Sequence, residues 1–266
     1  MSVSGPTPFV EAMGRLLRQK VMPTSMSSEE LQGLSAAVRE RSFFSARTSL
    51  EGYLDFAKGQ IQELVNPHAA TRTLEDGTTE TYTAGTDPAT VRLELRTMLE
   101  RLNYQPDPGK RGGIQDLSSD ARLDLVIKTN REMAQAYGQH RQTQNTEALD
   151  AIPADELIRA ESREVPREWQ SRWQTAGDAS GREDGWGIYG SRMIAQRNHP
   201  IWDSLGDPAL FPDGLGNPFP PFAFGSGMDV TGVRRDEAVQ LGVIAEGEMV
   251  LPTIPSFALD PELLTQ

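Results

Sequence analysis

The chain has 266 residues and no cysteine, and its 38 acidic and 26 basic residues give a formal net charge of −12. The missing cysteine excludes disulfides and thiolate metal sites, and the acidic balance argues against general binding to nucleic-acid phosphates. No apolar run approaches the 18 residues of a membrane span, and the N-terminus lacks an apolar signal core. The length suits one large domain or two modest ones.

Helical periodicity dominates the first half of the chain. Ser27 and Glu30 have the spacing of a capping box, and Asp87-Pro88 places an N-cap acid before a proline in the first turn. Apolar residues recur at steps of three and four in four segments, which we expect to be helices: 9–20, 27–38, 48–65 and 87–102.

Two segments of this half are candidates for contact with a partner. Phe43 and Phe44 are flanked by arginines, Arg47 among them, which suits either an anchor for an acidic partner or a core pair under arginine stems. Asp76-Gly77 lies between Thr- and Tyr-rich arms and predicts a hairpin near 73–83, with positive φ at both central residues. That hairpin is either a contact arm or a plain surface feature.

The stretch from 118 to 142 predicts one long amphipathic helix, with Ser118 and Ser119 as N-cap candidates. Two residues are unusual in it. Asn130 lies within the apolar stripe, where an amide needs hydrogen-bond partners. Gly138 is costly in a helix unless another backbone approaches closely.

Proline and glycine crowd the second half and predict loops. Trp169 and Trp173 lie four apart, on one face of a short helix or turn. The chain from 175 onward is expected to be loop-like, with a short strand at 192–195. Further expectations are a short helix from 154, no regular structure over 218–230, a helix over 234–244 ended by Gly242, and an extended tail over 246–266. The whole pattern predicts an α+β fold, with a mostly helical N-terminal half and a loop-rich C-terminal domain with a small sheet.

One acidic loop, 178–184, is the strongest candidate for chemistry. Asp178, Glu183 and Asp184 could bind a divalent cation through oxygen, although their spacing fits no standard calcium loop. With His199 they support an alternative function as a metal-dependent hydrolase or toxin-like transferase. No HExxH, GxSxG, P-loop or GxGxxG pattern occurs, so we expect no enzyme, no cofactor and no metal.

Four segments follow one another in an order that resembles the phage Mu F-like head morphogenesis family, the minor head proteins of tailed phages: KTNREMAQAYGQ (128–139), RAESREVPREWQSRWQTAGD (159–178), RMIAQRNHPIW (192–202) and PFPPFAFGSGMDV (218–230). The segment RSFFSAR (41–47) is similar to the N-terminal part of such proteins. In the family, a Thr-x-Asn helix with a later Gly precedes a Trp-containing strand-and-turn motif ending in Gly-Asp, and a Pro-Pro segment closes the domain. The matching positions are Thr129, Asn130, Gly138, Trp173, Gly177, Asp178, Pro220 and Pro221.

The sequence also departs from the family. Thr129 and Asn130 are adjacent, whereas the family spaces these residues by one. Many members have a His after the Gly-Asp turn and a Cys-Arg-Cys end after Pro-Pro. Here 181–184 and 222–224 take those places, without histidine or cysteine, so metal or thiol chemistry does not carry over.

The resemblance implies a minor head protein of the virion that acts in head morphogenesis near the portal. The Pro- and Gly-rich segment 106–113 is a loop or linker by composition and marks the internal boundary. The expected division is therefore a helical region at 1–115, a domain at 116–245 that the resemblance makes Mu F-like, and a tail at 246–266. The partners of the protein would be the portal protein, the major capsid protein or both, with a possible contact to packaged DNA through Arg39, Arg41 and Arg47, and no membrane. It would reside in the head near the portal and, during assembly, in the host cytoplasm. Asn130 would tie its helix to the Pro-Pro loop, and Gly138 would let that loop pass close.

Overall fold

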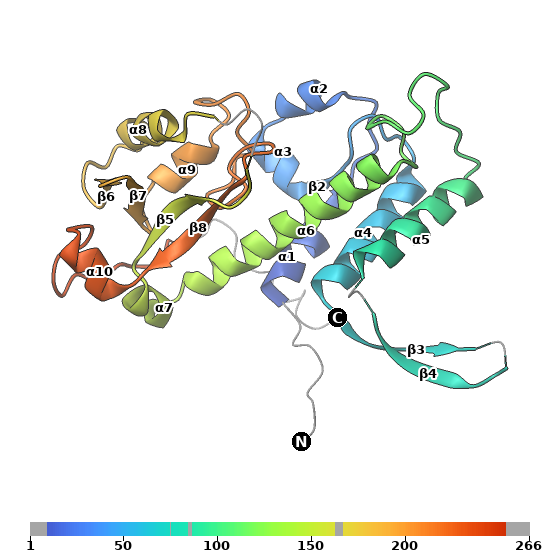
Figure 1. The fold of residues 1–266 in the computed structure, drawn as a ribbon, viewed down its shortest axis with the longest axis horizontal. Helices are drawn as coiled ribbons and strands as arrows, with labels where there is room; N and C mark the ends of the chain where they lie inside the picture. The colour runs from blue at the N-terminus through green and yellow to red at the C-terminus, as the bar shows by residue number, and fades with distance from the viewer. Residues whose placement is uncertain (1–9, 75, 85–86, 163–166, 254–266) are drawn as a thin grey trace. The chain divides into compact units, whose positions relative to one another are not determined.

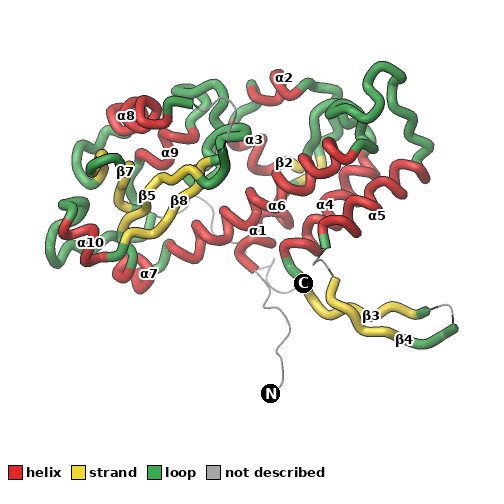
Figure 2. Tube along the Cα trace, in the orientation of Figure 1, coloured by secondary structure: helices red, strands yellow, loops and turns green. Residues whose placement is uncertain are grey.

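The computed structural model describes residues 10–253 except 75, 85–86 and 163–166, and the chain forms two compact units, 1–138 and 139–266. The described part has ten helices and three small sheets, which confirms the expected α+β fold (Figure 1). The two compact units divide at 138/139, whereas the sequence predicted a boundary at 115/116. Helix α6 (Asp120–Thr143) runs unbroken across the division between the units (Figure 2), and its first half buries Leu123 and Ile127 in the core of unit 1.

Unit 1 is a helical body. Its remaining helices are α1 (Val10–Arg18), α2 (Ser28–Gln32), α3 (Ala36–Arg41), α4 (Glu51–Val65) and α5 (Pro88–Arg101). Strands β1 (Lys20–Val21) and β2 (Ser42–Phe43) form a short parallel pair. The core forms where the apolar stripes of α1, α4, α5 and α6 meet, with Leu16, Leu54, Leu95 and Leu123 at most 1% exposed.

The helix starts read from the sequence are confirmed. Ser27 Oγ accepts from the Glu30 N–H at 3.2 Å while Glu30 returns a 2.7 Å bond, which completes the capping box. Asp87 accepts from two backbone N–H groups at the start of α5. The single helix expected over 27–38 is wrong, because α2 stops at Gly33 and Ser35 starts α3 by accepting from Val38.

A hairpin connects α4 to α5. Strands β3 (His68–Thr73) and β4 (Thr79–Ala84) pair antiparallel and project from the helices of unit 1 (Figure 1). At the tip, Gly77 N–H bonds Leu74 O and Leu74 N–H bonds Thr78 O, so three residues form the loop. The expected two-residue turn is therefore wrong: Gly77 has a positive φ of 81°, whereas Asp76 instead accepts from Thr78.

Unit 2 is built around one antiparallel sheet with strand order β6-β7-β5-β8. Its strands are β5 (Ala154–Arg159), β6 (Trp186–Tyr189), β7 (Arg192–Gln196) and β8 (Met228–Val233), and its helices are α7 (Thr146–Ala151), α8 (Trp169–Ala179), α9 (Ile201–Gly206) and α10 (Arg235–Gln240). Alternate side chains along the strands of this sheet belong to two separate hydrophobic cores. Leu157 and Ala195 join the aromatic residues of α8 and α9, whereas Ala154 and Ile194 join α7, α10 and the chain beyond them.

The second half of the chain holds more regular structure than its proline and glycine content predicts. The strand at 192–195 is confirmed as β7, and the helix from 234 is confirmed as α10, with Gly242 beyond it at φ 73°. The expected helix from 154 is wrong, because β5 pairs with a strand on each side. The loop expected from 175 is wrong up to Ala179, and the irregular stretch 218–230 ends in β8. Of the tail, 254–266 lie outside the described residues.

Candidate functional site

Arg182 organises the acidic loop of unit 2. Its guanidinium donates to Asp184 Oδ1 at 2.8 Å, to Gln196 Oε1 at 2.8 Å and to Asn198 Oδ1 at 3.3 Å. The Arg182 guanidinium also holds the pKa of the exposed Asp184 carboxyl below its usual range, chiefly through the hydrogen bond. Asp178 lies apart in α8, where it accepts from Gln174 at 3.0 Å. These acids are therefore engaged in local bonds.

His199 is buried beside this loop, with 2% of its surface exposed. Its Nδ1 accepts from the Ile201 N–H at 3.0 Å, and its Nε2 is buried with the backbone of Arg182 and Asp184 nearby. Burial first, and then the Arg182 charge, lower the pKa of His199 to about 4. The imidazole is therefore neutral near pH 7 and shielded from a solvent-borne substrate.

The acidic loop does not assemble a metal site. Across 10–253, outside the gaps already given, no three His, Asp or Glu side chains converge as ligands. Glu183 and Asp184 are exposed and follow the end of α8, whereas His199 is enclosed in the core. The arrangement is that of a loop held in place by the hydrogen bonds of Arg182, rather than that of an open metal-coordination site.

The motif tryptophan anchors the aromatic core of unit 2. Trp173 has no exposed surface, donates from Nε1 to Gly187 O at 3.1 Å and meets Trp202 edge-on at 5.3 Å between centroids. A Cβ on Gly177 would lie 2.0 Å from the Trp186 ring, so only glycine fits there. Trp173, Gly177 and Asp178 all belong to α8, so the strand-and-turn interpretation of these residues is wrong.

The closing Pro-Pro segment packs into the same core. The Pro220–Pro221 peptide is cis, and Pro221 O accepts from Asn217 Nδ2 at 3.2 Å. Phe222, which follows, is fully buried and stacks on Trp202 at 5.9 Å. Phe222, Trp202 and Trp173 therefore form one continuous aromatic core in unit 2.

The helix motif residues lie in α6 of unit 1. Asn130 is half-buried, and its Nδ2 donates to the Val126 carbonyl at 2.9 Å. This hydrogen bond lies within α6. It is not the expected hydrogen bond from Asn130 to the Pro-Pro loop. Thr129 is half-buried and Gly138 is buried.

The Phe43-Phe44 pair is largely internal. Phe43 is 1% exposed in the helical core, and Phe44 is half-buried. The hypothesis of a two-phenylalanine surface anchor is therefore wrong for Phe43. Arg47 is exposed, takes a positive φ of 54° and donates to Gln115 Oε1 at 3.0 Å.

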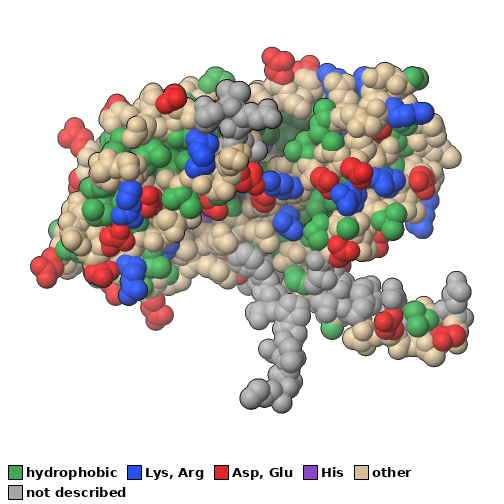
Figure 3. All heavy atoms as spheres, viewed as in Figure 1, with side chains coloured by type: hydrophobic (Ala, Val, Ile, Leu, Met, Phe, Trp, Pro, Cys, Tyr) green, Lys and Arg blue, Asp and Glu red, His purple; other side chains and the backbone are tan. Residues whose placement is uncertain are grey.

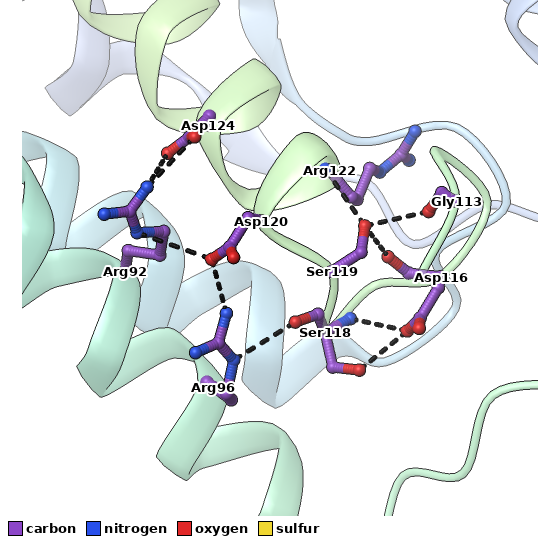
Figure 4. A network of polar contacts seen from close by, with 9 residues as sticks. All are labelled: Arg92, Arg96, Gly113, Asp116, Ser118, Ser119, Asp120, Arg122 and Asp124. Atoms are coloured by element: carbon purple, nitrogen blue, oxygen red, sulfur yellow. Dashed lines mark hydrogen bonds and ion pairs between the residues drawn. The ribbon is translucent and has the colours of Figure 1, made fainter. Parts of the chain in front are cut away.

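A polar network that the sequence did not reveal fixes the loop before α6 (Figure 4). Asp116 is 3% exposed and accepts from the Gly112 N–H at 2.8 Å and from the Ser118 N–H and Oγ at 2.9 and 2.7 Å. Burial opposes its charged form, but these hydrogen bonds outweigh burial and hold the pKa of Asp116 below its usual range. Buried Arg122 donates to Ser45 Oγ at 2.6 Å, which joins the start of α6 to the chain after β2. The only sequence signal for this network is an aspartate in a glycine-rich loop, and that pattern is too common to predict a buried hydrogen-bond network.

Salt bridges complete this network between α5 and α6. Arg92 lies 2.9 Å from Asp124, and Arg96 lies 2.6 Å from Asp120 (Figure 4). All four side chains are at least about one-third exposed, so the pairs contribute little to stability. Their main effect is to fix how α5 is aligned along α6.

The β3–β4 hairpin is the most exposed element of unit 1. Every residue of the hairpin whose side chain the structure describes is exposed, and Leu74 near the tip is 39% exposed. Thr71, Thr73, Thr79 and Thr81 share one face by register. An isolated two-stranded ribbon is marginally stable in water, so this arm would gain stability from a partner.

Comparison with known proteins gives no family model, no curated protein and no solved structure that matches the chain. The described helices are all too short or too polar to cross a bilayer.

Proposed function

We propose that this chain is a minor head protein of a tailed phage, acting in head morphogenesis near the portal. The proposal starts from the sequence resemblance, and the observation that carries it furthest is the β3–β4 hairpin. An arm with all its described side chains in water, free of any core of its own, suits a protein that completes its structure in an assembly.

The hairpin would dock on the portal protein or the major capsid protein. Its strands contain no proline and no lysine, the usual devices that protect an exposed edge from pairing. Strand addition or face packing would supply the partners that the outer strand edges need. A contact with packaged DNA would depend on Arg41 and Arg47, because Arg39 is only 6% exposed.

The enzymatic alternative has one observation in its favour, the buried imidazole of His199 beside the acidic loop. Against it, two of the three acids it needs are engaged in local hydrogen bonds, Asp184 with Arg182 and Asp178 with Gln174. A metal-dependent hydrolase or transferase would lose turnover in Asp178→Asn with folding intact. An assembly protein would show no turnover before or after that change.

Co-purification of the tagged chain with the portal and major capsid proteins of the phage proposed to encode it tests the assembly function. A Thr71→Lys/Thr81→Lys double variant places two charges on the exposed face of the hairpin, and we expect it to weaken co-elution. The control is Thr175→Lys on the exposed surface of α8 in unit 2. Failure of the folded wild-type chain to bind either protein would refute the proposal.

A further inference from the structure

The acidity of the chain is concentrated in unit 2. Residues 139–266 contain ten arginines and no lysine against twenty acidic residues, a formal net charge of −10. Unit 1 holds 16 basic and 18 acidic residues, a net charge of −2. In Figure 3, acidic side chains, with a few basic ones among them, lie over the end of unit 2 formed by α7 and α10. Unit 2 therefore carries the field that would select a basic partner.

At this end of unit 2 the chain forms a fixed strap, residues 245–253. Glu248 accepts from Gln196 Nε2 at 3.0 Å through Oε1 and from the Ala245 N–H at 2.8 Å through Oε2. Its carbonyl accepts from Arg235 at 2.9 Å. Further along, the Thr253 N–H donates to Gln144 at 2.8 Å. The strap is thus held at both ends before any partner arrives.

The middle of the strap alternates between core and solvent. Val250 is 4% exposed and belongs to the core beside α10. Its neighbours Met249 and Leu251 are 74% and 60% exposed, the highest values among the large apolar side chains described in unit 2. These two apolar side chains, two residues apart, lie on a segment that is already ordered. Binding through them would therefore cost little conformational entropy, so they suit an anchor for a partner.

We propose that the strap binds a protein partner through a groove with an apolar floor and a rim of lysine or arginine. Met249 and Leu251 would fill the floor. The rim would meet the exposed carboxylate of Glu246 in the strap itself. It would also meet Asp150 and Asp236, whose side chains are 75% and 84% exposed although Asp150 pairs with Arg235 at 3.0 Å and Asp236 with Arg234 at 3.8 Å. This inference rests on the assembly function proposed above, because it takes the portal or major capsid protein as the owner of the groove.

Binding of the purified full-length chain to each of these two proteins tests the strap. The Met249→Ser/Leu251→Ser double variant should bind about 100-fold more weakly, roughly tenfold for each apolar side chain no longer buried. The matched control is Leu93→Ser, because Leu93 is 61% exposed but lies on α5 of unit 1. The charge complementarity predicts that binding weakens by about tenfold or more between 0.05 and 0.5 M NaCl.

A photo-crosslinking amino acid at 251, with 93 as control, gives a second readout that does not depend on the strength of binding. Cross-links from 251 alone would support the strap. Undiminished binding of the double variant, with its tryptophan emission unchanged, would overturn the strap and leave the assembly function standing. A wild-type chain that binds neither protein overturns both. Self-association that the double variant abolishes would identify a second copy as the occupant and overturn the proposed partner.

Discussion

His199 makes the stability of unit 2 dependent on pH. Its pKa is lowered from 6.5 to about 4 in the folded chain, first by burial and then by Arg182. Between those values the unfolded chain binds the proton and the folded chain does not, so stability falls as pH falls below about 6.5. The shift is worth about 3 kcal/mol in full, of which about 2 kcal/mol is lost between pH 7.5 and 5.

His199→Asn isolates this contribution. Asparagine retains an acceptor that can take the Ile201 N–H bond now made to Nδ1, but it does not titrate. We therefore expect the loss of unfolding free energy between pH 7.5 and 5 to shrink by about 2 kcal/mol in the variant. His140, whose pKa is also lowered to about 4 by burial, is present in both proteins and cancels in the comparison.

Urea unfolding followed by tryptophan emission measures this directly, because all four tryptophans lie in unit 2. His68→Asn is the control, since His68 is exposed in the hairpin of unit 1. If wild type and His199→Asn lose the same free energy on acidification, the burial argument for His199 is refuted.

Three further substitutions test the packing. Gly177→Ala should destabilise unit 2 by about 1–3 kcal/mol in the same assay, because its Cβ would overlap the Trp186 ring; an unchanged midpoint would contradict that packing. Gly59→Ala should stabilise unit 1 by about 0.5–1 kcal/mol in thermal melts followed by circular dichroism, since no atom lies within 4 Å of the added Cβ. Asp116→Asn should destabilise unit 1 by about 1–3 kcal/mol and speed amide exchange at Gly112, because one oxygen that accepts a backbone N–H becomes an NH₂ donor; slow exchange in the variant would argue against the Asp116 network.

The sequence alone determined the elements that local chemistry specifies. The capping box at Ser27 and the Asp87-Pro88 start are bonds within one turn, so they form wherever the helix forms. The hairpin followed from Gly77 between β-favouring arms, although the loop proved one residue longer than the expected turn. The long helix from 118 followed from its apolar period, which a core on one side is enough to enforce.

Tertiary structure decided what depends on distant partners. The segment ADELIR (154–159) is compatible with the start of a helix. It forms a central strand because it hydrogen-bonds to β7 and β8, two strands that do not neighbour it in the sequence. The division between the units shifted to 138/139 because the first half of α6 packs against α1, α4 and α5, a contact that loop composition cannot show. Tertiary structure also decided that His199 is buried and that Met249 and Leu251 are exposed, because the solvent access of a side chain depends on what the rest of the chain packs against it.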